Sequence, residues 1–307
     1  MGVVLSETAE ELWRFLYPLI QNPYGVAAVL ANLYAESGLK PTNLQNNYER
    51  SLEMTDQQYT EAVDNGTYKD FASDGAGYGL AQWTYRTRKQ NMLAAAKATY
   101  MSIGELEFQA YFLSMELQNY SIVLNILKEA ASVQEASDAF VSMYEKPANL
   151  TDEKKARRAS FAQEYYDAYH MIGSEYDFVG EPYRVLKRGS SGTDVEQLQK
   201  GLIKAGYDVG PDGADGVYGR RTQEAVLAFQ RSIGLVDDGI AGALTQDLLL
   251  MLVLELPEME DERVEEEEEE TEKEAPTYTI MIEHLTEDEA EELFTRFEDR
   301  PVILEAE

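Results

Sequence analysis

Residues 26–41, VAAVLANLYAESGLKP, constrain the fold of this chain more than any other stretch. Four apolar residues recur with the spacing of an α-helix that buries one face: Val26, Val29, Leu30 and Leu33. Gly38 and Pro41 signal the end of this helix, which places Glu36 in its last turn. A negative charge is poorly placed there, because the carbonyl end of the helix dipole is also negative and an apolar wall excludes water. Both effects favour a protonated Glu36.

A carboxyl that stays protonated near neutral pH is what a general acid in glycoside cleavage requires. The position of Glu36 is therefore consistent with proton donation to a leaving oxygen. An ordinary exposed glutamate at a helix end is the alternative, and this stretch alone does not separate the two interpretations.

A second stretch, residues 74–84 (DGAGYGLAQWT), places three glycines around an aromatic residue. Glycine permits a tight turn and the close approach of another group to the backbone. Gln82 and Trp83 follow, which offers a polar side chain beside a stacking surface. The combination is typical of a loop that contacts a ligand.

Together, the acidic helix end and the glycine-rich turn resemble the lysozyme-like superfamily. There, an ES pair ends the core helix, here Glu36-Ser37, and a G-x-G-L-x-Q segment lines the sugar cleft, here residues 77–82. The closer resemblance is to the lysozyme domain of tailed phages and their endolysins, whose turn reads GYGLxQWT, and it covers roughly residues 5–170. It implies a mainly α-helical domain that cleaves the β-1,4 bond between MurNAc and GlcNAc with Glu36 as general acid.

The resemblance also suggests further site residues. Asp74 is a candidate second carboxylate, because in goose-type relatives an aspartate just before the turn helps to position the attacking water. An inverting enzyme needs such a base roughly 6.5–9.5 Å from the acid. The alternative is that Asp74 only caps the turn through its own backbone.

Five residues are candidate substrate contacts: Ser37, Tyr78, Gln82, Trp83 and Tyr144. For the three aromatic residues, packing in the core is the alternative. Glu116 and Glu145 also lie in stretches that resemble the family, and for both we expect a solvated helix face.

The composition excludes several other wall-degrading chemistries. The chain has no cysteine and only two histidines, His170 and His284. A cysteine amidase or peptidase would lack its nucleophile, and a zinc amidase would lack the histidines that such sites use. We therefore expect a carboxylate-based hydrolase with no metal and no cofactor. Two alternatives remain: a lytic transglycosylase, in which the sugar's own 6-hydroxyl replaces water, and an inactive wall-binding tail protein.

An internal repeat predicts a second module at residues 183–254. DGVYGRRT (residues 215–222) is echoed by DGIAGALT (residues 238–245), and in each we expect a glycine-closed turn whose threonine caps the following helix. Thr193 and Glu196 predict a capping box at the start of a helix that precedes the two turns. The doubled turns, preceded by LQ and FQ pairs, resemble the peptidoglycan-binding domain of cell-wall hydrolases.

The chain is long enough for two domains with separate cores. We expect a lysozyme-like domain at residues 1–172, a linker at 173–182 and a three-helix binding domain at 183–254. Residues 255–275 should form an extended acidic linker, because nearly continuous glutamate repels itself. Residues 276–307 suggest a small β-α-β unit of unknown role, which is too small to be stable alone and could mediate self-association.

Charge and the N-terminal segment limit the partners. The net charge is −31, and no basic patch with interleaved aromatics is present, which disfavours nucleic acid. The segment MGVVLSETAEELWRF is neither a signal peptide nor a membrane span. We expect bacterial peptidoglycan as the partner, without nucleic acid or membrane. An endolysin or virion-associated enzyme of this kind would be made in the bacterial host cytoplasm and act at the cell wall after release, or be carried on the virion.

Overall fold

The computed structural model describes residues 2–147, 149–172, 183–255, 278–279 and 302–303. The chain divides into two compact units, residues 1–257 and 258–307. Both predicted modules lie in the first unit, which is mainly α-helical as predicted. The two predicted linkers fall almost wholly outside the described residues.

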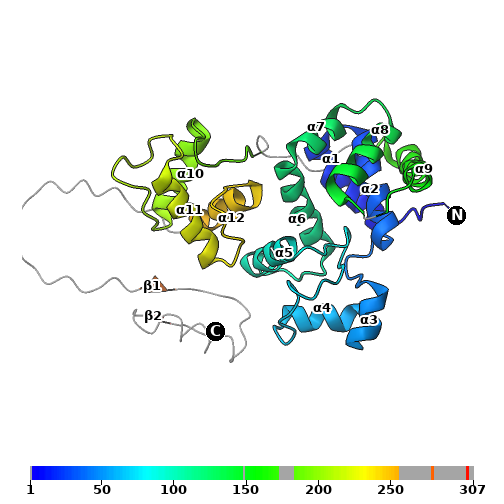
Figure 1. Ribbon diagram of the computed structural model, residues 1–307, viewed down its shortest axis with the longest axis horizontal. Coiled ribbons are helices and arrows are strands. Elements are labelled where there is room, and N and C mark those ends of the chain that lie inside the picture. The colour runs from blue at the N-terminus through cyan, green and yellow to red at the C-terminus, as the bar shows by residue number, and fades with distance from the viewer. Residues whose placement is uncertain (1, 148, 173–182, 256–277, 280–301, 304–307) are drawn as a thin grey trace, which may run out of the picture. The chain divides into compact units, whose positions relative to one another are not determined.

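The first module is drawn from blue to green in Figure 1. It consists of α1 (Glu7–Ile20), α2 (Pro23–Ser37), α3 (Asn46–Leu52), α4 (Asp56–Asp64), α5 (Arg86–Thr99), α6 (Leu106–Asn119), α7 (Ser121–Glu129), α8 (Val133–Phe140), a short π-helix, η1 (Val141–Glu145), and α9 (Asp152–Tyr169).

Helix α2 is the centre of this module. Every residue from 26 to 33 is fully buried, because α1, α7, α8 and α9 all pack against the helix (Figure 1). Such a helix is apolar all round rather than on one face. The side chain of Asn22 caps its first turn, and Pro23 occupies the first helical position. Gly38 ends it in the left-handed conformation, with φ 65°, so Glu36 lies in the last turn as predicted.

Several helix starts agree with the local sequence signals. The side chain of Ser6 caps α1, and Thr55 and Gln58 form a capping box at the start of α4. Thr151 caps α9. Thr84 does not cap a helix, because α5 begins after Tyr85 and the Thr84 hydroxyl donates to the carbonyl of Gln82.

The glycine-rich stretch forms a tight turn directly beside the end of α2. Tyr78 and Trp83 pair through two backbone hydrogen bonds of 3.2 and 2.9 Å. Ser37 Oγ donates to the carbonyl of Leu80 at 2.9 Å, which ties the helix end to the turn. Gln109 of α6 supports the other side, since its Oε1 accepts the N–H of Leu80 at 2.8 Å. The two sequence motifs are therefore one structural unit.

The second module contains α10 (Thr193–Lys204), α11 (Arg220–Ser232) and α12 (Ala243–Glu255). Its repeat is confirmed, but the threonines do not cap helices. Gln199 Nε2 donates to Asp215 Oδ1 (2.8 Å) and Thr222 Oγ1 (3.0 Å), while its Oε1 accepts the N–H of Gly216. Gln199, the glutamine of the LQ pair, thus connects the turn to the helix that follows it.

The second copy repeats this arrangement. Gln230 Nε2 donates to Asp238 Oδ1 (3.1 Å) and Thr245 Oγ1 (3.3 Å), and its Oε1 accepts the N–H of Gly239. The capping box predicted at Thr193 is also wrong, because α10 begins after Gly192 and no side chain caps it. Thr222 and Thr245 lie within their helices, and each accepts a hydrogen bond from a glutamine of the preceding helix.

Contacts between α12 and α6 join the modules within the first unit. The hydroxyl of Tyr111 donates to Asp247 at 2.7 Å, and Asn119 Oδ1 accepts the N–H of Ala243 at 2.9 Å. In the second unit, β1 (Tyr278–Thr279) pairs in parallel with β2 (Val302–Ile303), as two strands of a β-α-β unit would. The helix predicted between them lies outside the described residues.

Candidate active site

Glu36 lies at the exposed end of the buried helix α2. Its side chain is 25% exposed and forms an ion pair with Arg158 of α9. The guanidinium of Arg158 also donates to the carbonyl and to the side-chain oxygen of Asn32, both at 3.2 Å. Asn32 lies one turn before Glu36, so these bonds fix the arginine along the last turn of α2.

A second carboxyl, that of Glu145 in η1, shares the same arginine. Its Oε2 lies 3.0 Å from Arg158 Nη1, and its side chain is only 4% exposed. Neither carboxyl oxygen accepts a hydrogen bond from any described residue. Burial raises the pKa of Glu145 to about 8, Arg158 opposes this rise, and the neighbouring carboxyl of Glu36 adds to it.

Glu116 of α6 forms the centre of an adjoining polar cluster. It accepts hydrogen bonds from Trp83 Nε1 (2.7 Å), Arg88 Nε (2.7 Å) and the hydroxyl of Tyr144 (2.6 Å). The Arg88 guanidinium also lies 4.6 Å from the centre of the Tyr144 ring. Burial raises the pKa of Tyr144, so its hydroxyl stays protonated and donates to the carboxylate.

The π-helix η1 connects these two groups of side chains. Its consecutive residues Tyr144 and Glu145 point into different clusters, one toward Glu116 and the other toward Arg158. Short π-helical turns occur frequently at functional sites. Helix α8 runs directly into this widened turn.

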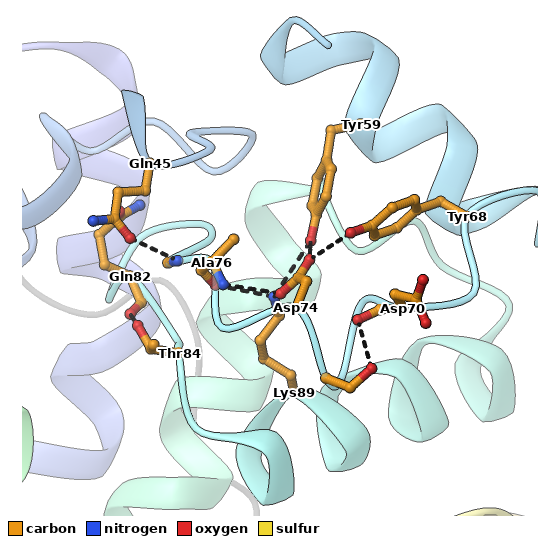
Figure 2. Close-up of polar contacts among 11 residues, drawn as sticks. Gln45, Tyr59, Tyr68, Asp70, Asp74, Ala76, Gln82, Thr84 and Lys89 are labelled. Carbon is orange, nitrogen blue, oxygen red and sulfur yellow. Dashed lines mark hydrogen bonds and ion pairs between the residues drawn. The ribbon is translucent and has the colours of Figure 1, made fainter. Parts of the chain in front are cut away.

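Asp74 lies in a third cluster, which Figure 2 shows. Its carboxylate is 5% exposed and accepts from Lys89 Nζ (2.6 Å), the hydroxyls of Tyr59 and Tyr68, and the N–H of Ala76 (2.9 Å). The bond to Ala76 is the turn cap kept as the alternative in the sequence analysis. Four donors leave this carboxylate poorly placed to hold an attacking water.

The predicted substrate contacts are engaged within the protein. The rings of Tyr78 and Trp83 are fully buried, and that of Tyr144 is 2% exposed, so stacking on a sugar is not supported in this conformation. Ser37 bonds to the turn, and Gln82 Nε2 donates to the carbonyl of Asn43 at 2.9 Å. Of these side chains, Ser37 is the one that connects the helix end carrying Glu36 to the turn.

Sequence reasoning missed Glu145, Glu116 and Arg158. The first two were predicted on a solvated helix face, which is wrong, because both carboxyls are buried in ion pairs. A signal for Arg158 was available. It precedes Phe161 by three residues and therefore shares the inward face of α9 with Phe161 and Tyr165.

Comparison with known families identifies the first module. Residues 7–169, more than half of the chain, match the family model described as phage tail lysozyme. The chain belongs to the phage tail lysozyme family. The resemblance drawn from the ES pair and the glycine-rich turn is therefore confirmed.

Residues 191–249 of this phage tail lysozyme family member match the putative peptidoglycan binding domain. The second module is thus identified as well, and its match covers the doubled turns of the repeat. None of the described helices is both long and apolar enough to cross a membrane. Among the described residues, no group of three or more histidine, aspartate or glutamate side chains is arranged to hold a metal ion.

Curated relatives match over short segments. The N-acetylmuramoyl-L-alanine amidase CwlL of Bacillus licheniformis is 46% identical over 65 residues, which are 21% of this chain and 18% of the amidase. The spore cortex-lytic enzyme of Bacillus cereus is 43% identical over 67 residues, covering 22% of this chain and 25% of that enzyme. The type VI secretion system spike protein VgrG3 of Vibrio cholerae is 44% identical over 46 residues, covering 15% and 4%.

The chain thus spans a quarter or less of the length of these relatives. No solved structure matches it. The relatives share a segment with this chain, and their own activities are not carried over by matches of this length.

Proposed function

We propose that this chain is a peptidoglycan hydrolase that cleaves the β-1,4 bond between MurNAc and GlcNAc, with Glu36 as general acid. The observation that carries the proposal is the setting of the Glu36 carboxyl, which is partly exposed at the end of a buried helix and adjoins a buried carboxyl. Membership of the phage tail lysozyme family and the peptidoglycan-binding module support it. Glu36 would donate its proton to the leaving glycosidic oxygen.

The contacts around Glu36 serve this role. Ser37 fixes the helix end to the turn, and Gly38 ends the helix immediately after the acid, so the Glu36 backbone has little freedom. A fixed acid within hydrogen-bond reach of the leaving oxygen accelerates bond cleavage. The binding module would hold the enzyme on the wall, whether the protein acts as an endolysin or from the virion.

One observation favours a second candidate reaction. Asp74 accepts from four donors, so the structure offers no free carboxylate at the position expected for a catalytic base. A lytic transglycosylase needs no such base, because the 6-hydroxyl of the sugar attacks intramolecularly. The alternative of an inactive tail protein is less well supported, since Glu36 and the turn beside it are intact.

The test is the Glu36→Gln variant on purified peptidoglycan. Removing the general acid should lower the rate by about 10²- to 10⁴-fold while circular dichroism and wall sedimentation stay as in the wild type. Asp194→Asn is the matched control, because it removes one negative charge from an exposed ion pair in the binding module. Near-normal turnover of folded Glu36→Gln would overturn the assignment.

Mass spectrometry of the wild-type products separates the chemistries. Reducing-end muramic acid indicates a hydrolase, and anhydro-muramic ends indicate a transglycosylase. Free peptides with intact glycan would contradict both and indicate an amidase.

The anchoring role is tested by ending the chain at residue 172. Sedimentation with purified walls should weaken, while cleavage of short soluble glycans persists. Equal wall binding by the shortened chain would show that the second module is not the anchor.

A further inference from the structure

Glu36 and Glu145 are held on opposite nitrogens of one guanidinium. Arg158 Nη2 pairs with Glu36 and Nη1 with Glu145, so side chains from α2, η1 and α9 meet at a single cation. One arginine compensates only one of two carboxylate charges. The remaining negative charge must be neutralised by a proton or by water.

Glu145 has little access to water and no compensating hydrogen bonds. Its side chain is 4% exposed, and neither oxygen accepts a bond from any described residue. A buried carboxylate in this condition is costly, whereas a protonated carboxyl donates to a neighbouring acceptor. The acceptor held on the same guanidinium is the carboxyl of Glu36.

We propose that Glu145 is a positioning residue for the reaction: its buried carboxyl shares a proton with Glu36 and keeps Glu36 in the acid form that donation requires. The inference rests on the proposed role of Glu36 as general acid. Two carboxyls that share a site titrate as a pair, because the second ionisation is opposed by the first.

The charged groups that act most strongly on Glu145 come from three helices. Arg158 of α9 and Arg88 of α5 favour its ionised form, and Glu36 of α2 opposes it. Burial has the largest influence and also opposes ionisation, which is why the pair retains its proton near neutral pH. The raised pKa of Glu145 agrees with this geometry.

The proton balance of hydrolysis follows directly. The pair gives its proton to the glycosidic oxygen as the bond to the anomeric carbon breaks, and both carboxylates are then ionised around Arg158. Water adds to the anomeric carbon, and the proton that it releases returns to the pair. Arg158 compensates the doubly ionised state between these two steps.

The π-helix explains how Glu145 is kept in place. Tyr144, the preceding residue, is anchored by its bond to Glu116 and by the guanidinium of Arg88 over its ring. The widened turn then directs Glu145 toward Arg158. The anchored side chain of Tyr144 and the ion pair with Arg158 together hold the Glu145 carboxyl in place.

The experiment is the pH profile of kcat/KM for wild type and Glu145→Gln. Without the Glu145 carboxyl, Arg158 pairs only with Glu36 and favours its ionised form. The alkaline limb of the profile should therefore move down by about one pH unit or more. At a pH above that limb the variant should lose about ten-fold in rate relative to wild type, while activity at acid pH persists. An unmoved limb, or the same loss at every pH, would overturn the inference.

A variant with the opposite expected effect strengthens the test. In Arg158→Gln the pair loses its cation and holds its proton more tightly, so the alkaline limb should move up. Glu10→Gln, which removes one negative charge from an exposed ion pair with Arg14 away from this site, controls for the change in net charge and should leave the limb in place. Shifts of Glu145→Gln and Arg158→Gln in the same direction would contradict a shared proton.

A titration of the wild-type chain needs no variant to fold. The ¹³C carboxyl signals of Glu36 and Glu145 should each show the same two titration steps, and two independent single-step curves would refute the pair. Failure of the proposed function is distinguished by Glu36→Gln. If Glu36→Gln is active, Glu36 is not the general acid and the proposed function fails. If Glu36→Gln is inactive but the alkaline limb of Glu145→Gln is unmoved, only the inference about Glu145 fails.

Discussion

Asp74 and Glu145 are buried to nearly the same extent, at 5% and 4% exposure, and each pairs with one cation. Their partners differ. Asp74 accepts from Lys89, two tyrosine hydroxyls and a backbone N–H, whereas Glu145 accepts no hydrogen bond from the described residues and adjoins another carboxyl. Burial and an ion pair alone therefore do not mark a functional carboxylate. The number of donors around it separates a structural group from one that is placed to hold a proton.

The cation of each cluster shows the same contrast. Lys89 is fully buried and bonds to Asp74, to the Ala76 carbonyl (2.9 Å) and to the Tyr59 hydroxyl (3.3 Å), all within one cluster (Figure 2). Burial lowers its pKa, and Asp74 opposes that change. Arg158 divides its charge between two carboxyls. The charges of the Asp74 cluster balance, whereas two ionised carboxyls at Arg158 would leave one negative charge uncompensated.

The largest effect is expected from breaking the Asp74 cluster at Lys89. In Lys89→Met the Asp74 carboxylate stays buried without its cation, which should cost about 3–5 kcal/mol in the free energy of unfolding. Urea denaturation measures this loss. The double variant Lys89→Met, Asp74→Asn should recover part of it, because the uncompensated charge is then removed as well. A loss under about 1 kcal/mol in the single variant would show that the pair contributes little.

A smaller loss is expected when one donor is removed. Tyr59→Phe takes one hydroxyl from Asp74 and keeps the ring that packs against Tyr68 and Phe71. A hydrogen bond to a charged group contributes about 1.5–3 kcal/mol, so this range is the expected destabilisation. Tyr100→Phe is the control, since Tyr100 is 92% exposed and lies outside this cluster. Equal stability of the Tyr59 and Tyr100 variants would contradict the role assigned to the donors.

The sequence sufficed for several features whose signal is local. The buried helix with Glu36 in its last turn and the doubled turns of the second module both depend on residues within a few positions of one another. The capping box predicted at Thr193 had an equally local signal and was wrong. The threonines of the repeat were predicted as caps for the same reason. Their true partners, Gln199 and Gln230, lie in the preceding helices, more than ten residues away.

The candidate site depended on contacts that are distant in the chain. Glu36 was predicted, but the cation that it pairs with, Arg158, lies 122 residues further on. Glu116 and Glu145 were assigned to solvated faces, because a charged residue in a helix is usually exposed. Only the fold shows that α6, η1 and α9 bring these charges together. The counterion of this buried site is far from Glu36 in the sequence, so no local pattern identifies it.

The last expected effect is the pH dependence of stability caused by Glu145, which is modest for each pH unit. Its pKa is raised from an ordinary value of 4.5 to about 8 in the folded chain. Between these values the folded state holds a proton that the unfolded state has lost, so the contribution of Glu145 is fully present below pH 4.5 and is lost as the pH rises through 8. One such group changes the free energy of unfolding by at most about 1.4 kcal/mol per pH unit.

Glu145→Gln should therefore become more stable relative to wild type as the pH rises from 5 to 8, measured by urea denaturation at each pH. Asp194→Asn should show no such trend in this range, because its ion pair with Arg184 lowers the pKa of Asp194 and confines its titration to more acid pH. A constant difference between Glu145→Gln and wild type would mean that Glu145 is ionised throughout, and the contrast with Asp74 would then rest on geometry alone.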